Sequence, residues 1–335
     1  RSKGDHESNL DDATRWRVTE GGPAPQRLHL GITPWQLVGA TAQSIGEQAS
    51  FAEQLGYHSF WLPENHFAPH ALPDPLMMLT AAAGVTQRIR LGTTSFLITL
   101  RNPLQAAEQV AVLDQLSEGR VLLGMGRGYA PQMLQAFQVP IKEKRRIFAW
   151  TLELMQRAWA GEAISLDGDP AHAVAVHPLP VQRPHPPLWV AAFGPKALAQ
   201  AGTLGLPYLS SPMESLGTLV GNYDVHAAAA QAAGHQRSST VPLMRTIFVG
   251  EDPAQVANLR QRMQAEYENT RLLPGETLDD WALIGDPEFV REGVARYRER
   301  LGMTHLIATR LRLPGVDAPA HRRSATLLAE TLVDR

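Results

Sequence analysis

The sequence predicts a parallel α/β fold, and its closed form, the (β/α)8 barrel, is favoured over the competing doubly wound open sheet. Three observations carry this prediction. From Arg27 onward, short runs of β-forming residues alternate with longer helical periods. Eight such strand candidates occur, the number in a closed barrel. They follow one another to the end of the chain without a linker, so residues 27–335 are expected to form one domain after an N-terminal extension over 1–26.

The first half of the chain supplies four strand and helix pairs. The predicted strands are LHLGI (28–32), HSFWLP (58–63), IRLGTTSF (89–96) and VLLGMG (121–126). The predicted helices cover 44–55, 75–83, 103 to a stop at Gly119, and 141–159. Ile147, Trp150, Leu154 and Ala158 share one face of the last helix, as in an amphipathic helix.

The second half is less regular. Residues 161–187 are polar and rich in proline, which predicts a short hairpin or excursion inserted after the fourth βα unit. Strand and helix resume at LWVAAFGPKALAQAG (188–202) and continue with PYLSS (207–211), VPLMRTIFVG (241–250) and THLIATRLR (304–312). Residues 266–285 are expected to be a loop or an insertion.

Composition excludes several functional classes. Hydrophobic residues make up 44% of the chain, and its 31 basic and 33 acidic residues nearly cancel, so neither a nucleic acid nor a membrane surface is an expected partner. The absence of cysteine excludes disulfides, a thiolate nucleophile and cysteine-ligated metal. The opening RSKGDHESNLDD lacks the apolar region of a secretion signal, and a cytoplasmic protein is therefore expected.

In a barrel the chemistry lies where strands end, so these positions supply the candidate site residues. They are Glu64-Asn65-His66-Phe67, Thr93-Thr94-Ser95, Gly126-Arg127-Gly128, Phe193-Gly194-Pro195-Lys196 and Ser210-Ser211. His66 fits a general base or a hydrogen-bond donor at a cleft, although a single loop histidine is often a plain surface residue. No metal site is predicted, because His58, His66 and His70 lack a recognised ligand spacing.

The glycine cluster from Gly124 to Gly128 has two possible explanations. It is not a dinucleotide-binding motif, because its spacing is G-x-G-x-G and it lies in the fourth βα unit. Either the small residues let a ligand approach the backbone while Arg127 binds a phosphate, or they form a tight turn in which Arg127 pairs with a carboxylate. Gly194-Pro195-Lys196 favours the phosphate, because a proline at the first helical position leaves free N–H groups at the same rim.

Several of these residues together resemble the bacterial luciferase-like family of flavin-dependent monooxygenases. The resemblance runs from about Leu28 to the C-terminus and depends on WLPENHF (61–67), LGTT (91–94), LDQLSEGR (113–120), Gly124–Gly128 and the late GDPE (285–288). It implies a (β/α)8 barrel that uses reduced FMN, supplied by a separate flavin reductase, and O2 through a C4a-(hydro)peroxyflavin to oxygenate a small organic substrate. Family members are commonly homodimers, so a homodimer is expected.

The resemblance also implies roles for individual residues. Arg127 would hold the flavin phosphate, together with backbone N–H groups at Gly194 and Lys196. Thr94-Ser95 matches the place of a non-proline cis peptide beneath the flavin ring, and Gly128, Phe193 and Ser210 complete the expected cofactor site. His66 would exchange protons with peroxide or substrate, oriented by Asn65 and Glu64. The chain departs from the luciferases at Asn65, Gly126 and Met133, which stand in place of a histidine, a reactive cysteine and an acidic residue; this argues against light emission.

Three other functions remain open. The first is a 5-deazaflavin-dependent oxidoreductase on the same fold, and the second is a flavin-binding barrel without catalysis. The third is a sugar- or phosphate-processing barrel, which would need a pair of carboxylates where only Glu64 is well placed. Apolar residues expected around the mouth favour a hydrophobic or aromatic substrate, although the same residues also suit ordinary loop packing. They are Trp35, Phe67, Phe96, Tyr129, Met133, Phe193 and Met213.

Overall fold

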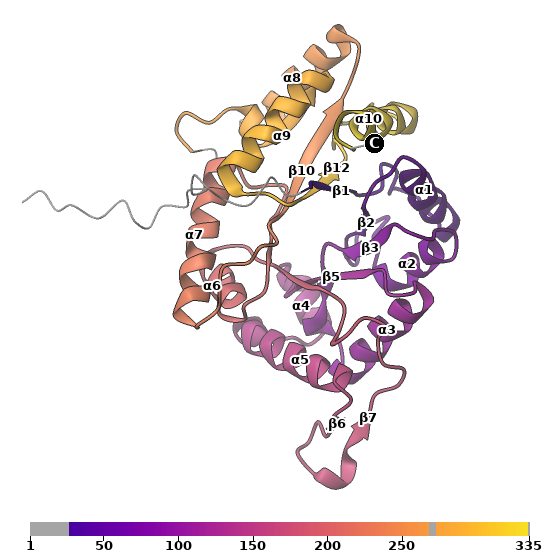
Figure 1. Cartoon of the computed structure of the whole chain (residues 1–335), viewed down its shortest axis with the longest axis vertical. Helices are drawn as coiled ribbons and strands as arrows, with labels where there is room; N and C mark the ends of the chain where they lie inside the picture. Colours follow the sequence, from indigo (N-terminus) through magenta and orange to yellow (C-terminus); the bar gives the residue numbers. More distant parts are fainter. Residues whose placement is uncertain (1–26, 268–272, 334–335) are drawn as a thin grey trace, which may run out of the picture.

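The computed structural model describes residues 27–267 and 273–333, and these form a parallel sheet surrounded by helices (Figure 1). Eight strands follow the order β10-β12-β1-β2-β3-β5-β8-β9, which is that of a (β/α)8 barrel. Each corresponds to one of the predicted strands. Their bounds are β1 (His29–Ile32), β2 (Ser59–Leu62), β3 (Arg90–Thr93), β5 (Val121–Gly126), β8 (Leu188–Ala191), β9 (Tyr208–Leu209), β10 (Pro242–Val249) and β12 (His305–Thr309). The expected extension over 1–26 lies outside the described residues.

The ring closes in two different ways. The first and last strands pair through a backbone ladder that places His29 opposite His305 and Ile32 opposite Ala308. Among the described residues no ladder joins β9 to β10, and side chains close this seam instead. The Ser210 hydroxyl accepts the Met244 N–H at 3.3 Å, and the Tyr223 hydroxyl lies 3.0 Å from the Pro242 carbonyl and 3.4 Å from the Tyr208 carbonyl.

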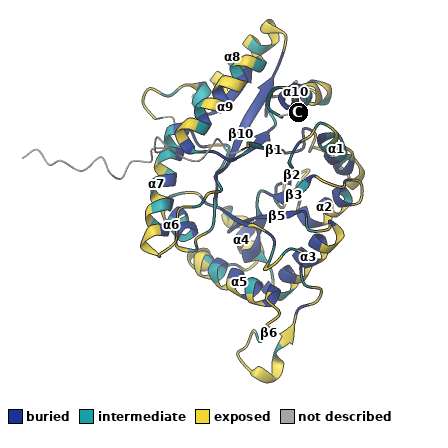
Figure 2. Ribbon diagram, in the orientation of Figure 1, coloured by how far each residue is buried: buried dark blue, intermediate teal, exposed yellow. Residues whose placement is uncertain are grey.

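Helices cover the outside of the ring with their buried faces turned toward the strands (Figure 2). They are α1 (Ala42–Gln54), α2 (Pro75–Ala83), α3 (Pro103–Leu116), α4 (Pro131–Ala136), α5 (Lys144–Trp159), α6 (Pro195–Thr203), α7 (Leu216–Ala232), α8 (Pro253–Tyr267), α9 (Pro287–Leu301) and α10 (Ala318–Leu332). None of the helices in the described part of the chain is long and apolar enough to cross a bilayer. The predicted start of α5 is early by one turn, because residues Ile141–Glu143 form a separate 3-10 turn, η3.

Several helices begin with the same local signal, a polar cap followed by proline. Asp74, Asn102 and Asp286 each precede a proline and accept a backbone N–H from the first turn of α2, α3 and α9, at 3.1, 2.9 and 2.8 Å. Proline has no N–H to leave unsatisfied at this position, and the cap satisfies one of the remaining donors. These helix starts are therefore complete without a ligand.

Side chains fill the barrel interior. Trp61 and Trp189 stack with ring centroids 5.0 Å apart, among Leu122, Leu209, Met244 and Ile307. Gly92 makes room for Trp61, because a Cβ atom at residue 92 would lie 2.1 Å from the indole ring. The interior is a packed core, so a ligand has to bind at one end of the barrel.

The stretch Leu113–Arg120, on which the resemblance partly depends, has a structural role. Arg120 is buried and donates to the carbonyls of Ser117, Ile89, Ala83 and Thr86 at 2.7–3.1 Å. These contacts hold the turns that lead into β3 and β5 at the amino ends of the strands. The stretch supports the barrel and lies away from the expected site.

The two irregular segments differ in outcome. The predicted hairpin is confirmed: β6 (Ala163–Ile164) and β7 (Val174–Ala175) pair antiparallel and project from the body below α5 (Figure 1). The prediction of a loop or insertion for residues 266–285 is wrong at its end, where β11 (Ala282–Gly285) pairs parallel with the outer half of β10. Its four residues ALIG, all buried, carry too little pattern to be recognised as a strand.

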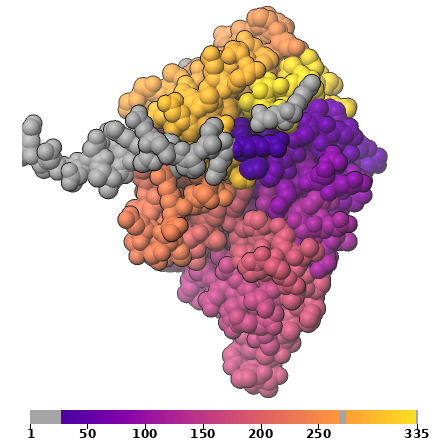
Figure 3. Space-filling view, in the orientation of Figure 1, coloured from indigo at the N-terminus to yellow at the C-terminus, as the bar shows by residue number. Residues whose placement is uncertain are grey.

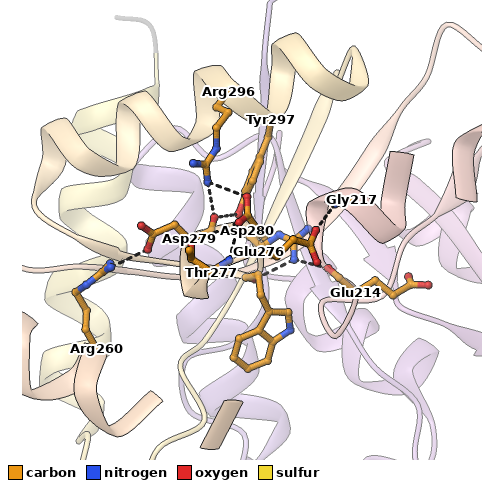
Figure 4. Close-up of polar contacts among 11 residues, drawn as sticks. Glu214, Gly217, Arg260, Glu276, Thr277, Asp279, Asp280, Arg296 and Tyr297 are labelled. Carbon is orange, nitrogen blue, oxygen red and sulfur yellow. Dashed lines mark hydrogen bonds and ion pairs between the residues drawn. The ribbon is translucent and has the colours of Figure 1, made fainter. Parts of the chain in front are cut away.

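Polar contacts fasten the segment before β11 to its neighbours (Figure 4). Glu276 accepts the Gly217 N–H at the start of α7, at 2.6 Å. Asp279 pairs with Arg260 at 2.8 Å, and its carbonyl accepts the Tyr297 hydroxyl at 2.6 Å. The segment is thereby tied to α7, α8 and α9.

Candidate functional site

Glu64, just beyond the end of β2, is the centre of a buried polar cluster. Its side chain has 0% exposure. One carboxylate oxygen lies 2.8 Å from Arg101 Nη1 and 2.8 Å from His66 Nε2, and the other accepts the Leu97 N–H at 2.9 Å. Arg101 also lies over the Phe96 ring, 4.1 Å from its centroid. The carboxylate is therefore fully partnered and holds one nitrogen of His66 in a fixed direction.

His66 packs between this carboxylate and aromatic rings. Its ring is 4.8 Å from Phe137 and 5.7 Å from Phe67, and Phe67 is 71% exposed. Asn65 was expected to orient His66, and the structure corrects this. The Asn65 amide oxygen instead accepts the Leu72 N–H at 2.7 Å, so that Asn65 fixes the loop 65–72. Glu64 alone of the two predicted partners contacts His66.

Close approach between two neighbouring segments explains most of the glycine cluster. A Cβ at Gly124 would lie 2.1 Å from the Thr93 carbonyl oxygen, and one at Gly126 would lie 2.1 Å from Ser95 Oγ. The expected cis peptide is present at Thr94-Ser95, between these two contacts. Gly128 has φ +70°, a conformation that favours glycine. The cluster thus lets β5 pack against the segment that carries the cis bond.

The contacts of Arg127 test one of the two explanations that the sequence left open. Its guanidinium donates to the Gln200 side-chain oxygen at 2.8 Å and to the Ala191 carbonyl at 2.9 Å, and it lies 4.9 Å from the Phe148 ring centroid. Within the described ranges 27–267 and 273–333 it has no carboxylate partner, so the tight turn with an ion pair is wrong in that detail. Burial, and then the charge of Arg145, lower the pKa of Arg127 to about 10.

Two further cations surround Arg127 that the sequence analysis did not single out. Lys144 donates to the Gly128 carbonyl at 3.2 Å. Its pKa is lowered by burial, then by Arg127 and Arg145. Gln200 joins the group by donating to the Arg145 carbonyl at 2.8 Å. Arg127, Lys144 and Arg145 are named the cation cluster below. The signal available in the sequence was three basic residues at 144–146, in a first helical turn where the dipole disfavours them.

Helix starts next to the cation cluster lack the caps found elsewhere in the barrel. Neither Glu143 before α5 nor Gly194 before α6 makes a side-chain capping bond. Gly194 has φ +81° and is followed by Pro195, and Lys196 is exposed. Uncapped N–H groups and cations are the groups that bind anions in proteins, so this arrangement could hold a multiply charged anion.

The remaining predicted residues divide into exposed and buried ones. Thr94 and Ser95 are half-buried, and Phe193 is 75% exposed. Ser210 is 1% exposed, and its hydroxyl belongs to the seam between β9 and β10, so it is not an open rim residue. Of the apolar residues expected at the mouth, Trp35, Phe96 and Met133 are buried in packing, whereas Phe67, Tyr129, Phe193 and Met213 are exposed.

Comparison with known proteins gives the family. The luciferase-like monooxygenase family matches residues 24–305. The chain is 31% identical over 310 residues to an F420-dependent glucose-6-phosphate dehydrogenase of Kineococcus radiotolerans, covering 81% of this chain and 88% of the relative. It is 32% identical over 219 residues to the uncharacterized protein y4vJ of Sinorhizobium fredii, covering 63% of this chain and 61% of that protein. The match thus covers less than two thirds of the length of y4vJ.

Solved structures share the fold. Monooxygenase RslO1 from Streptomyces bottropensis aligns with a TM-score of 0.73 and 27% identity, over 91% of this chain and 99% of that one. The oxygenating constituent of 3,6-diketocamphane monooxygenase from Pseudomonas putida, a complex with FMN, also aligns with a TM-score of 0.73, at 19% identity over 92% and 97% of the two chains. Because the family matches most of the chain and the architecture agrees, the chain belongs to the luciferase-like monooxygenase family of oxidoreductases.

Proposed function

We propose that this protein is a two-component monooxygenase that binds reduced FMN and uses O2 to oxygenate a small, partly hydrophobic organic substrate. The cation cluster is the observation that carries the proposal. Three cations and uncapped helix starts suit the terminal phosphate of FMN, which carries up to two negative charges, better than a neutral or singly charged group.

The residues present fit this cofactor. Arg127, Lys144 and the start of α6 would hold the phosphate, and the half-buried Thr94-Ser95 segment would support the ring. When bound, reduced flavin supplies the electrons that activate O2. His66 would give or take a proton at substrate or oxygen, since Glu64 fixes its Nε2 and leaves Nδ1 for that exchange.

Exposed apolar side chains support the substrate class. Phe67, Tyr129, Phe193 and Met213 are 52–89% exposed at loops following the strand ends. Such residues exclude water around a reacting group and favour an apolar or aromatic substrate. A separate flavin reductase would supply the reduced cofactor, and a homodimer remains the expected assembly.

Binding measurements test the cofactor. Wild type should bind FMN more tightly than riboflavin, which lacks the phosphate. Arg127→Met should weaken FMN binding by about tenfold or more, while riboflavin binding changes little. Lys142→Met, which removes a neighbouring exposed cation, is the matched control. Equal affinity of wild type for FMN and riboflavin would contradict the phosphate assignment.

A second candidate is a 5-deazaflavin-dependent oxidoreductase. The similarity to an F420-dependent dehydrogenase over 88% of its length favours it. Oxidised F420 and FMN should be titrated in parallel, because binding of F420 alone would overturn the monooxygenase proposal. Mass spectrometry of products formed with reduced FMN and isotope-labelled O2 then tests oxygen transfer, and a product without label would count against it.

A further inference from the structure

Three histidines meet at the amino ends of the strands, at the opposite end of the barrel from the cation cluster. His29 begins β1, His305 begins β12, and His58 immediately precedes β2. Their potential ligand nitrogens all lie within 4.8 Å of one another. The rings of His29 and His58 are 4.3 Å apart between centroids, and those of His29 and His305 are 4.5 Å apart. The first described residues lie beside the C-terminal helix on this surface (Figure 3).

Hydrogen bonds leave ring lone pairs available in this group. His305 Nδ1 lies 2.9 Å from the Thr304 hydroxyl. That hydroxyl accepts the Val241 N–H at 2.8 Å and lies 3.4 Å from the Val241 carbonyl. In the tautomer in which the hydroxyl also accepts from His305 Nδ1–H, the Nε2 lone pair is free for a ligand. His58 Nδ1 is buried and has no partner among the described residues. A hydrogen bond to the ring nitrogen that does not bind the metal, as Thr304 makes to His305 Nδ1, orients histidine ligands in metal sites.

The surroundings of the three histidines disfavour their protonated forms. Burial is the largest cause that lowers their pKa values, to about 4 for His58 and about 3 for His305, and the pKa of His29 is lowered too. Repulsion from the other histidines, Arg90 and Arg27 adds to the effect. Neutral imidazole is the form that binds a metal.

We propose that His29, His58 and His305 form a binding site for a divalent transition metal, with Zn²⁺ as the expected ion. Three imidazoles and a water are a known ligand set for tetrahedral Zn²⁺. At Zn–N distances of about 2.0–2.1 Å the ligand nitrogens are about 3.4 Å apart, so the rings would turn inward by side-chain rotation. The backbones need not move, because β1 and β12 hold His29 opposite His305.

A cavity next to the histidines provides room for the fourth ligand. It has a volume of about 190 Å³ and is bordered by Arg27, Leu28, Gly56 and Val333 besides His29 and His58. This volume accommodates water and small anions. A metal here would join the first, second and last strands of the barrel.

Positive charges nearby limit the affinity. Arg90 donates to the Arg120 carbonyl, the Val121 carbonyl and the Gln182 side chain at 2.9–3.2 Å, and Arg27 borders the cavity. No carboxylate belongs to the described group of ligands. The site should therefore prefer a metal whose fourth ligand is an anion, such as hydroxide or chloride.

Metal titration of the full chain, stripped with a chelator, tests the proposal. Calorimetry should find one equivalent of Zn²⁺ bound, and Co²⁺ should give the intense visible bands of tetrahedral coordination. Zn²⁺ should also raise the melting temperature, because it binds the folded state. His58→Ala and His305→Ala should each weaken Zn²⁺ binding at least about tenfold. His235→Ala, which removes an exposed histidine elsewhere, should leave it unchanged.

Two results would overturn the site. One is a Co²⁺ spectrum without tetrahedral bands in wild type, and the other is equal Zn²⁺ affinity in His58→Ala and His235→Ala. Circular dichroism of each variant reports whether it has folded, and His58→Gln serves if His58→Ala has not. FMN binding by His58→Ala should equal that of wild type, since the two sites lie at opposite ends of the barrel.

Discussion

Strand β2 has a titratable side chain just beyond each of its ends, and their surroundings are opposite. At the carboxyl end, Glu64 is buried with Arg101 and His66 around it, so its negative charge is matched. At the amino end, His58 is buried beside two other histidines and positive charges, so it stays uncharged. One end of the sheet therefore carries paired charges, whereas the other carries histidines whose protonated form is disfavoured. Burial is the largest cause that lowers the pKa of His58, whereas at the other end the partners Arg101 and His66 match the charge of the buried Glu64 side chain.

The largest expected effect concerns the charged end. Glu64→Ala removes the carboxylate that Arg101 and His66 share and leaves Arg101, with a side chain only 16% exposed, without its ionic partner. Breaking such a buried pair costs about 3–5 kcal/mol of unfolding free energy. Glu143→Ala, which breaks an exposed pair with Arg146, should cost less than about 1 kcal/mol. Urea unfolding measures the free energy of unfolding of both variants. Equal losses would show that the buried ion pair of Glu64 stabilises the fold no more than the exposed pair of Glu143.

Packing at the same end gives an intermediate effect. Gly126→Ala should cost about 1–3 kcal/mol, because its Cβ would lie 2.1 Å from Ser95 Oγ. Gly221→Ala in α7 meets no atom within 4 Å and should instead stabilise the fold by about 0.5–1 kcal/mol. Adding Ser95→Ala to Gly126→Ala should recover part of the loss. If thermal unfolding gives the two glycine variants the same stability, the approach of residue 126 to Ser95 does not require glycine.

The smallest effect concerns the uncharged end and depends on pH. The unfolded chain protonates His58 near pH 6.5, whereas the folded protein resists protonation until about pH 4. Between these values the unfolded state binds more protons, so stability is greatest above pH 6.5 and falls as the pH falls. The slope should be on the order of 1 kcal/mol per pH unit, with His29, His305, Arg90 and Arg27 contributing to it.

Unfolding in urea at pH 7, 6 and 5, with chelator present, measures this slope. His58→Gln should make the slope shallower, because glutamine does not titrate, while His29 and His305 still contribute. A variant slope as steep as that of wild type would show that His58 does not resist protonation in the folded protein.

Strand order and the ends of strands could be predicted from the sequence. Buried apolar runs define a strand locally, and a parallel barrel brings the carboxyl ends of its strands to one rim, so the sequence correctly places Glu64, Arg127 and Gly194 just beyond strand ends. The expected contact of Asn65 with His66 is wrong, because residue spacing does not give the direction of a side chain in a loop. The prediction that Ser210 contacts the cofactor stays a prediction, although its hydroxyl lies in the seam between β9 and β10. Lys144 and Arg145 were overlooked because a short mixed-charge run usually marks a solvated helix surface.

The histidine cluster could not be predicted. His29 and His305 stand at opposite ends of the sequence, and only the pairing of the first strand with the last brings them together. The expectation of no metal site considered His58 with His66 and His70, its neighbours along the chain. In the fold His58 lies instead at the other end of β2 from His66.

The barrel wall is held less firmly at the seam between β9 and β10 than at the other joints between its strands. The hydroxyl groups of Ser210 and Tyr223 join the two strands by single hydrogen bonds. Water can replace each of these bonds without breaking a ladder of backbone hydrogen bonds. Transient opening of the wall should therefore begin at this joint, while the β1–β12 joint stays shut. Water would then reach the interior beside Trp189 and Leu209 first, entering through the side of the barrel and not through its ends.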